Sequence, residues 1–155
     1  MSAFEGGFHL VGNPADTNML SLPLVSAAYT KGDCVFLADG GTSWAAVTST
    51  TRQHTRKAVL QETLTDVAGL FGNGILCDTS QLWVAETAND AVVVAHRGDR
   101  MAFTDSNTVN NSGTDIATSL GCFQQLAASG TLTDKRIIGQ FVGLSGYGVQ
   151  IDSAV

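Results

Sequence analysis

Short apolar runs, separated by glycine and polar turns, recur along the whole chain. Most are rich in valine and aromatic residues and are too short for amphipathic helices, so they are typical of β-strands. The clearest pair forms a hairpin, because an Asp-Gly-Gly turn at 39–41 joins two apolar runs and Asp-Gly is a strong hairpin signal. The predicted strands are 34–38, 44–48, 82–85, 91–95, 100–103 and 137–142.

Two segments carry an apolar pattern that fits either a helix or a strand. Residues 55–71 are the best helix candidate, although 58–64 also fits a strand. Residues 116–129 predict a short helix that ends at Gly130, or a strand over 120–126. We therefore expect a mainly β fold, a small β-barrel or sandwich of the β-tulip kind, with one or two short helices.

The first 25 residues differ from the rest of the chain. Glycine or proline at positions 6, 7, 12, 14 and 23 interrupts any helix or long strand, and the apolar residues follow no helical period. We expect an extended N-terminal arm over 1–25 and a single β-rich domain over 26–155. The arm either packs on its own domain as an edge strand or reaches a neighbouring subunit or partner.

A turn made of a basic residue, glycine and aspartate occurs twice, at Lys31-Gly32-Asp33 and at Arg97-Gly98-Asp99. Glycine can adopt the positive φ of a tight turn, and aspartate can accept hydrogen bonds from nearby backbone. We interpret both as structural turns. The Arg-Gly-Asp tripeptide is then a coincidence of that role and not a receptor motif.

Composition narrows the class of function. Only 14% of the 155 residues are charged, below the usual value of about 25%, which predicts an oligomer or an assembly component. A net charge of −6 argues against nucleic acid as a partner. The one basic cluster contains Arg52, His54, Arg56 and Lys57, and it is either a solvated loop or a contact with an acidic partner.

The three cysteines are interpreted as buried free thiols. Cys34, Cys77 and Cys122 each lie beside apolar residues, and no CxxC motif or paired histidine indicates zinc. An odd count without a disulfide framework fits assembly in a reducing cytoplasm. Because no secretory signal or membrane-spanning run is visible, we expect no membrane partner.

No constellation of residues predicts catalysis, so we expect no enzyme activity, no catalytic residues and no cofactor. His9, His54 and His96 are scattered, no Gly-x-Ser-x-Gly elbow occurs, and most aspartates fall at turns. The loop at 105–110 is rich in oxygen ligands but lacks the glycine and glutamate spacing of a calcium loop. We predict no metal site, with a bound cation in this loop as the open alternative.

Lys-Gly-Asp-x-Val at 31–35, followed by Gly-Gly-x-x-Trp at 40–44, resembles the core of tailed-bacteriophage head decoration (cement) proteins. Residues 67–69, 89–99 and 137–142 resemble the same family, so the resemblance covers roughly residues 27–143. It implies a structural virion protein that binds the outer surface of the phage head as homotrimers at threefold positions. The implied partner is the major capsid protein, the implied site of assembly is the host cytoplasm, and no catalytic residues carry over.

Under this resemblance the arm recognises the capsid. The candidate partner-binding residues are Phe4, Phe8, Leu10, Met19, Leu20, Leu22 and Trp44. An alternative is a carbohydrate-binding or adhesion module of a phage tail or cell surface, with its site at Trp44, Trp83 and the loop at 105–115. A small β-fold hydrolase that depends on a histidine is a third alternative.

Overall fold

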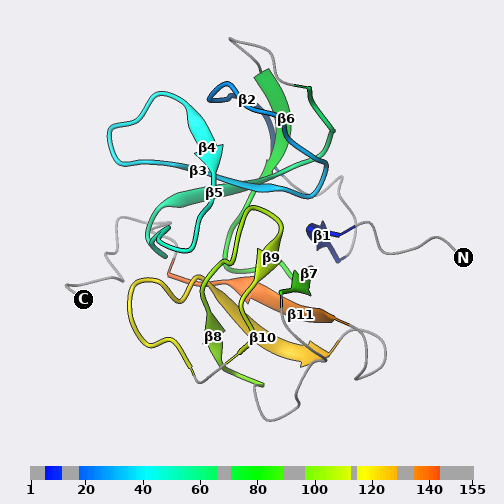
Figure 1. Ribbon diagram of the computed structural model, residues 1–155, viewed down its shortest axis with the longest axis vertical. Coiled ribbons are helices and arrows are strands. Elements are labelled where there is room, and N and C mark those ends of the chain that lie inside the picture. Colours follow the sequence, from blue (N-terminus) through cyan, green and yellow to red (C-terminus); the bar gives the residue numbers. More distant parts are fainter. Residues whose placement is uncertain are drawn as a thin grey trace, which may run out of the picture.

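The computed structural model describes residues 6–11, 18–65, 71–88, 97–112, 115–128 and 135–143. Within these ranges the chain consists of β-strands and loops and contains no helix. The strands form two sheets, which Figure 1 shows one above the other. The prediction of a mainly β fold of the small barrel or sandwich type is confirmed, whereas the short helices are absent from the described ranges.

The five-stranded sheet curls into a half-barrel. Its strands lie in the order β2 (Met19–Pro23), β6 (Phe71–Leu76), β5 (Arg56–Leu60), β3 (Cys34–Leu37) and β4 (Trp44–Ala46), and all are antiparallel. Just after β2, Leu24 forms a parallel bridge with Trp44, and the Val25 N–H donates to the Trp44 carbonyl at 2.8 Å. The two edges of the sheet therefore meet at one end. The enclosed core comprises Leu22, Leu24, Tyr29, Val35, Trp44, Ala58 and Leu60.

The six-stranded sheet packs against the outer face of the half-barrel. Its strands lie in the order β1 (Phe8–Leu10), β7 (Trp83–Thr87), β11 (Arg136–Phe141), β10 (Phe123–Ala128) and β8 (Arg100–Met101). A short sixth strand, β9 (Thr108–Val109), pairs with β7 in parallel. The core between the sheets combines Phe8, Trp83, Phe123 and Phe141 of this sheet with Cys34, Val59 and Ile75 of the other.

Strand β5 shows why the helix expected at 55–71 is wrong for the described part of that segment, and residues 66–70 lie outside the described ranges. Ala58 and Leu60 face the core of the half-barrel, whereas Val59 faces the core between the sheets. A strand that is buried on both faces has a continuous apolar sequence, which periodicity alone does not distinguish from a buried helix. The alternative of a strand within 58–64 was closer to the structure.

Several other strands predicted from the sequence can be compared directly with those of the structure. The hairpin is confirmed by the antiparallel pairing of β3 with β4, and the strand alternative within 116–129 is confirmed by β10. The strands predicted at 82–85, 100–103 and 137–142 correspond to β7, β8 and β11. The predicted strand at 91–95 lies outside the described residues, and β9 was not predicted.

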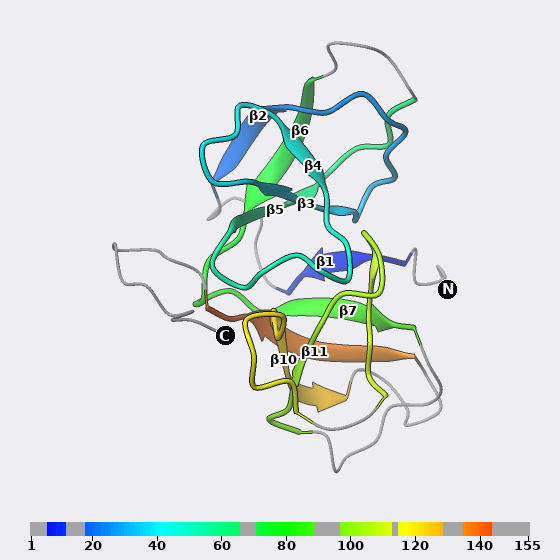
Figure 2. The same ribbon diagram turned by 60° about the vertical axis from the view of Figure 1, so that its left-hand side comes forward.

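The described part of the expected N-terminal arm packs on its own domain. Strand β1 pairs with β7, and β2 pairs with β6, so the two strands lie at edges of different sheets. Figure 2 shows β1 alongside β7 at the boundary between the sheets. This is the edge-strand interpretation of the first 25 residues, and residues 1–5 and 12–17 lie outside the described ranges.

The first Gly-Asp turn has the role that the sequence predicted. Gly32 has φ +97°, and the Thr30 N–H donates to Oδ2 of Asp33 at 2.9 Å. Gly98 of the second turn also has a positive φ, +91°, but lies exposed at the surface. The two similar motifs therefore occupy different environments, one buried and one open to solvent.

Candidate partner-binding surface

The seven predicted partner-binding residues lie in different environments in the structure. Phe8, Leu22 and Trp44 are buried in the cores of this chain, so the prediction that they bind a partner is wrong. Leu10 is partly buried and packs against the core between the sheets. Phe4 lies outside the described residues.

Met19 and Leu20 lie on the exposed edge of the half-barrel, with 48% and 44% of their surfaces accessible. The Leu76 N–H donates to the Asn18 carbonyl at 2.9 Å. This bond shows that the peptide groups of Asn18, and of every second residue after it in β2, point toward β6. In an antiparallel ladder, alternate residues direct their peptide groups toward and away from the partner strand. The peptide groups of Met19 and Ser21 therefore face the open side of β2.

Two further exposed apolar residues extend this surface. Phe71 begins β6 opposite Pro23 and is 61% exposed, and Val25 follows β2 with 47% exposed. We call Met19, Leu20, Val25 and Phe71 together the β2 edge. They flank the edge strand on both faces of the sheet, since Leu20 lies on the face of Leu22 and Met19 on the opposite face. Large exposed apolar side chains of this kind are typical of interaction sites. Phe71 was not among the expected partner-binding residues, because it ends the segment that the sequence predicted to be a helix.

The alternative carbohydrate site is not formed as expected. Trp44 lies in the core of the half-barrel and Trp83 in the core between the sheets, and both indole rings are buried. Stacking on a sugar requires an exposed ring face. These two tryptophans therefore serve as core residues, and the prediction of a glycan site built on them is wrong.

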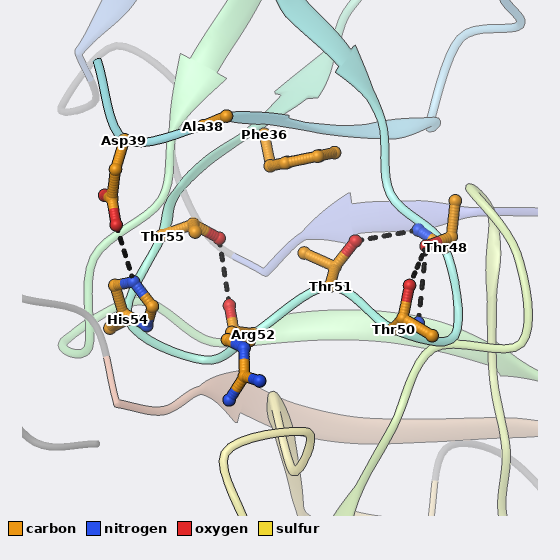
Figure 3. Close-up of a pocket in the computed structure, with 9 residues that line it drawn as sticks. All are labelled: Phe36, Ala38, Asp39, Thr48, Thr50, Thr51, Arg52, His54 and Thr55. Atoms are coloured by element: carbon orange, nitrogen blue, oxygen red, sulfur yellow. Dashed lines mark hydrogen bonds and ion pairs between the residues drawn. The ribbon is translucent and has the colours of Figure 1, made fainter. Parts of the chain in front are cut away.

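A shallow cleft of about 230 Å³ lies beside the loop between β4 and β5 (Figure 3). Several of its polar groups bond to one another. The Thr48 N–H donates to Oγ1 of Thr51 at 2.9 Å, and Nε2 of His54 lies 3.0 Å from Oδ2 of Asp39. The cleft residues are Phe36, Ala38, Asp39, Thr48, Thr50, Thr51, Arg52, His54 and Thr55. These bonds order the loop and leave the cleft without an assigned ligand.

Lys57 does not belong to the surface cluster that the sequence indicated. Its side chain is fully buried, and its ammonium donates to the carbonyls of Arg52, Gln53 and Thr55 at 2.9, 3.2 and 2.9 Å. Burial lowers the pKa of Lys57. The lysine holds three backbone carbonyls of one loop, so a basic surface here consists of Arg52, His54 and Arg56 alone.

The three cysteines are buried free thiols, as predicted. Burial raises the pKa of each one, and it raises the pKa of Cys122 to about 11. The Cys122 thiol also donates to the Thr51 carbonyl at 3.1 Å. Because the thiolate is the reactive form of cysteine, these positions are structural.

The raised pKa of Cys122 predicts a loss of stability in alkali. Between its ordinary pKa of 9.0 and about 11, the unfolded thiol releases a proton that the folded thiol keeps. Stability therefore falls as the pH rises through this window, by roughly 3 kcal/mol for this group. Urea unfolding in reducing buffer at pH 8 to 11 should show the advantage of wild type over Cys122→Ala shrinking with pH. Parallel pH profiles for the two proteins would contradict this prediction.

Among the described residues, no helix has the length and apolar character needed to cross a membrane.

Comparisons with known proteins found no relative of this chain. It matched no protein family, no curated protein and no solved structure.

Proposed function

We propose that this chain is a structural virion protein that decorates the outer surface of a bacteriophage head and stabilises it as a homotrimer. The observation that carries the proposal is the β2 edge, where the edge strand of a sheet is flanked by large exposed apolar side chains. The proposal is also supported by the low content of charged residues, 14%, and by the sequence resemblance to decoration proteins.

The β2 edge has two means of holding a capsid subunit. An extended segment of the partner can pair with the outward peptide groups of Met19 and Ser21, as in strand addition. Phe71 provides an aromatic anchor, a residue type that is enriched in interface cores. Together these contacts suit a partner that presents an extended apolar segment at the shell surface.

Stabilisation of the shell then follows from buried area and copy number. A capsid under internal pressure fails at the seams between its subunits. A trimer that bridges a seam adds interface area, and a standard interface buries about 1,600 Å² in total. Because one trimer presents three such surfaces, its binding to the shell is multivalent and stronger than that of one subunit.

Substitution of the β2 edge should weaken shell binding without unfolding the chain. We expect Leu20→Ser and Phe71→Ser each to lower the affinity for expanded shells of the phage at least tenfold, about 1.4 kcal/mol. Co-sedimentation of purified protein with undecorated shells measures this loss. The matched control is Leu82→Ser, because Leu82 is also exposed, at 39%, but precedes β7 of the other sheet. Equal binding to the shells by wild type and by all three variants would overturn the proposal.

A further inference from the structure

Asparagine followed by glycine occurs once in the sequence, at Asn73-Gly74 in β6. In this dipeptide the backbone nitrogen of glycine can attack the side-chain carbonyl carbon of asparagine, because glycine has no Cβ atom to hinder the approach. A succinimide ring forms, the bond from Cγ to Nδ2 breaks, and ammonia leaves with the proton of the glycine nitrogen. Water then opens the ring and leaves aspartate or isoaspartate, so Asn73 is a candidate site of deamidation.

The pairing of β6 with β2 opposes this attack. Gly74 lies opposite Leu20 in the register, and the Leu76 N–H donates to the Asn18 carbonyl at 2.9 Å. Because peptide groups alternate along an antiparallel strand, the Gly74 N–H also faces β2. The extended backbone keeps this nitrogen away from Cγ of Asn73, so ring closure requires β2 to leave β6.

Strand β2 can open without the rest of the half-barrel. It lies at the edge of the sheet, where the described part of the chain pairs Met19–Pro23 with β6 alone. Strands at an edge open locally at a lower free-energy cost than strands that are paired on both sides. Since β6 is also paired with β5, opening of β2 releases the Gly74 nitrogen while β6 stays in its sheet.

The surroundings of Asn73 determine what the change would do. Its side chain is exposed on the same face of β6 as Phe71, and it lies opposite Ser21 of β2. Its own N–H donates to Oε2 of Glu62 at 2.8 Å. A carboxylate at position 73 would repel that of Glu62, and isoaspartate would also lengthen the backbone by one carbon atom. Both products therefore disturb the strand on which β2 is paired.

We infer that Asn73 deamidates when β2 opens, and that the product loosens the pairing of β2 with β6. The step consumes only water, which reaches the exposed side chain. A free chain therefore loses an intact β2 edge with time. A partner strand that binds paired β2 stabilises the closed state and slows the reaction. This last effect rests on the proposed function, whereas the deamidation does not.

Peptide mass spectrometry of the folded chain, kept in warm and mildly alkaline buffer, tests the opening step. Leu22→Ala truncates a buried side chain of β2 whose Cδ1 lies 2.8 Å from the place of a Cβ atom at Gly74. It should speed the deamidation of Asn73 by about tenfold or more, because β2 loses its packing in the half-barrel. The matched control is Ile137→Ala in β11, which removes a fully buried side chain of the other sheet and should leave the rate near that of wild type.

Equal deamidation rates in wild type and Leu22→Ala, or an equal acceleration by Ile137→Ala, would overturn the opening step. If Leu22→Ala does not fold, the milder pair Leu22→Val and Ile137→Val gives the same comparison.

Hydrogen exchange at the Gly74 amide tests the effect of the product on β2. Asn73→Asp has the charge of the deamidated residue, and Asn73→Gln keeps the amide and serves as its control. Exchange should be several-fold faster in Asn73→Asp, and equal exchange in the two variants would overturn this part of the inference. Neither measurement uses phage shells. A failure of shell binding would therefore count against the proposed function alone.

Discussion

Replacing Phe141 with alanine is expected to lower the free energy of unfolding by about 4 kcal/mol. The Phe141 side chain is fully buried at the end of β11, and its ring packs against four other aromatic rings. Their centroids lie 5.2 to 6.3 Å from its own, and the partners are Phe8, Trp83, Phe103 and Phe123. Truncation leaves a cavity among rigid rings that cannot collapse to fill it, which places the cost near the upper end for such substitutions.

The matched control for this substitution is Phe71→Ala. Phe71 is the same residue type, but most of its surface is already exposed, so its truncation should change the free energy of unfolding by less than about 0.5 kcal/mol. Urea unfolding followed by tryptophan fluorescence measures both variants. A loss below about 1.5 kcal/mol for Phe141→Ala would show that the aromatic cluster is not the centre of the core.

Local turn chemistry explains which elements the sequence could predict. The β3–β4 hairpin depends on Asp39 and Gly40, which lie next to each other and specify the turn without help from the rest of the chain. Strand β5 depends instead on two separate cores, one on each face, that form only when both sheets assemble. Its apolar sequence therefore contains too little information to separate strand from helix.

The partner-binding surface was predictable only in part, for a related reason. Hydrophobic identity shows that a residue avoids water, but it does not show whether its own chain or another one covers it. Leu20 and Leu22 lie two residues apart in β2, yet Leu22 is buried in the half-barrel and Leu20 is largely exposed. The difference arises because Leu22 lies deep within the curled sheet and Leu20 lies near its open end.

The contact between the Asp33 turn and the loop before β9 was beyond the reach of sequence reasoning because the two segments are distant along the chain. The sequence marked both the Asp33 turn and the oxygen-rich loop at 105–110, and it interpreted each one separately. The hydrogen bond from Cys34 to Ser106 brings them together, and that contact depends on the packing of one sheet on the other. Long-range pairing of this kind has no local signature.

The close backbone contact between Gly7 and Gly32 predicts the second large loss of stability, for a substitution at Gly7. Gly7 has φ +75°, and the next residue, Phe8, donates its N–H to the Gly32 carbonyl at 2.9 Å. A Cβ atom added at Gly7 would lie 2.6 Å from the oxygen of that carbonyl and 2.8 Å from its carbon. Backbone atoms cannot rotate away, so an alanine here would push β1 off the turn that ends in Asp33.

We expect Gly7→Ala to lower the free energy of unfolding by about 4 kcal/mol and Gly40→Ala by only about 1 kcal/mol. Gly40 has a similar φ of +71°, but an added Cβ atom would meet nothing within 4 Å. Both variants carry the left-handed strain of roughly 1 to 2 kcal/mol, and only Gly7→Ala adds the overpacking cost of roughly 1 to 3 kcal/mol. Urea unfolding measures the free energy of unfolding of both variants, and the difference between them gives the overpacking cost apart from the backbone strain. Equal losses of stability would contradict this prediction, because they would mean that the Gly32 backbone yields to the added Cβ atom.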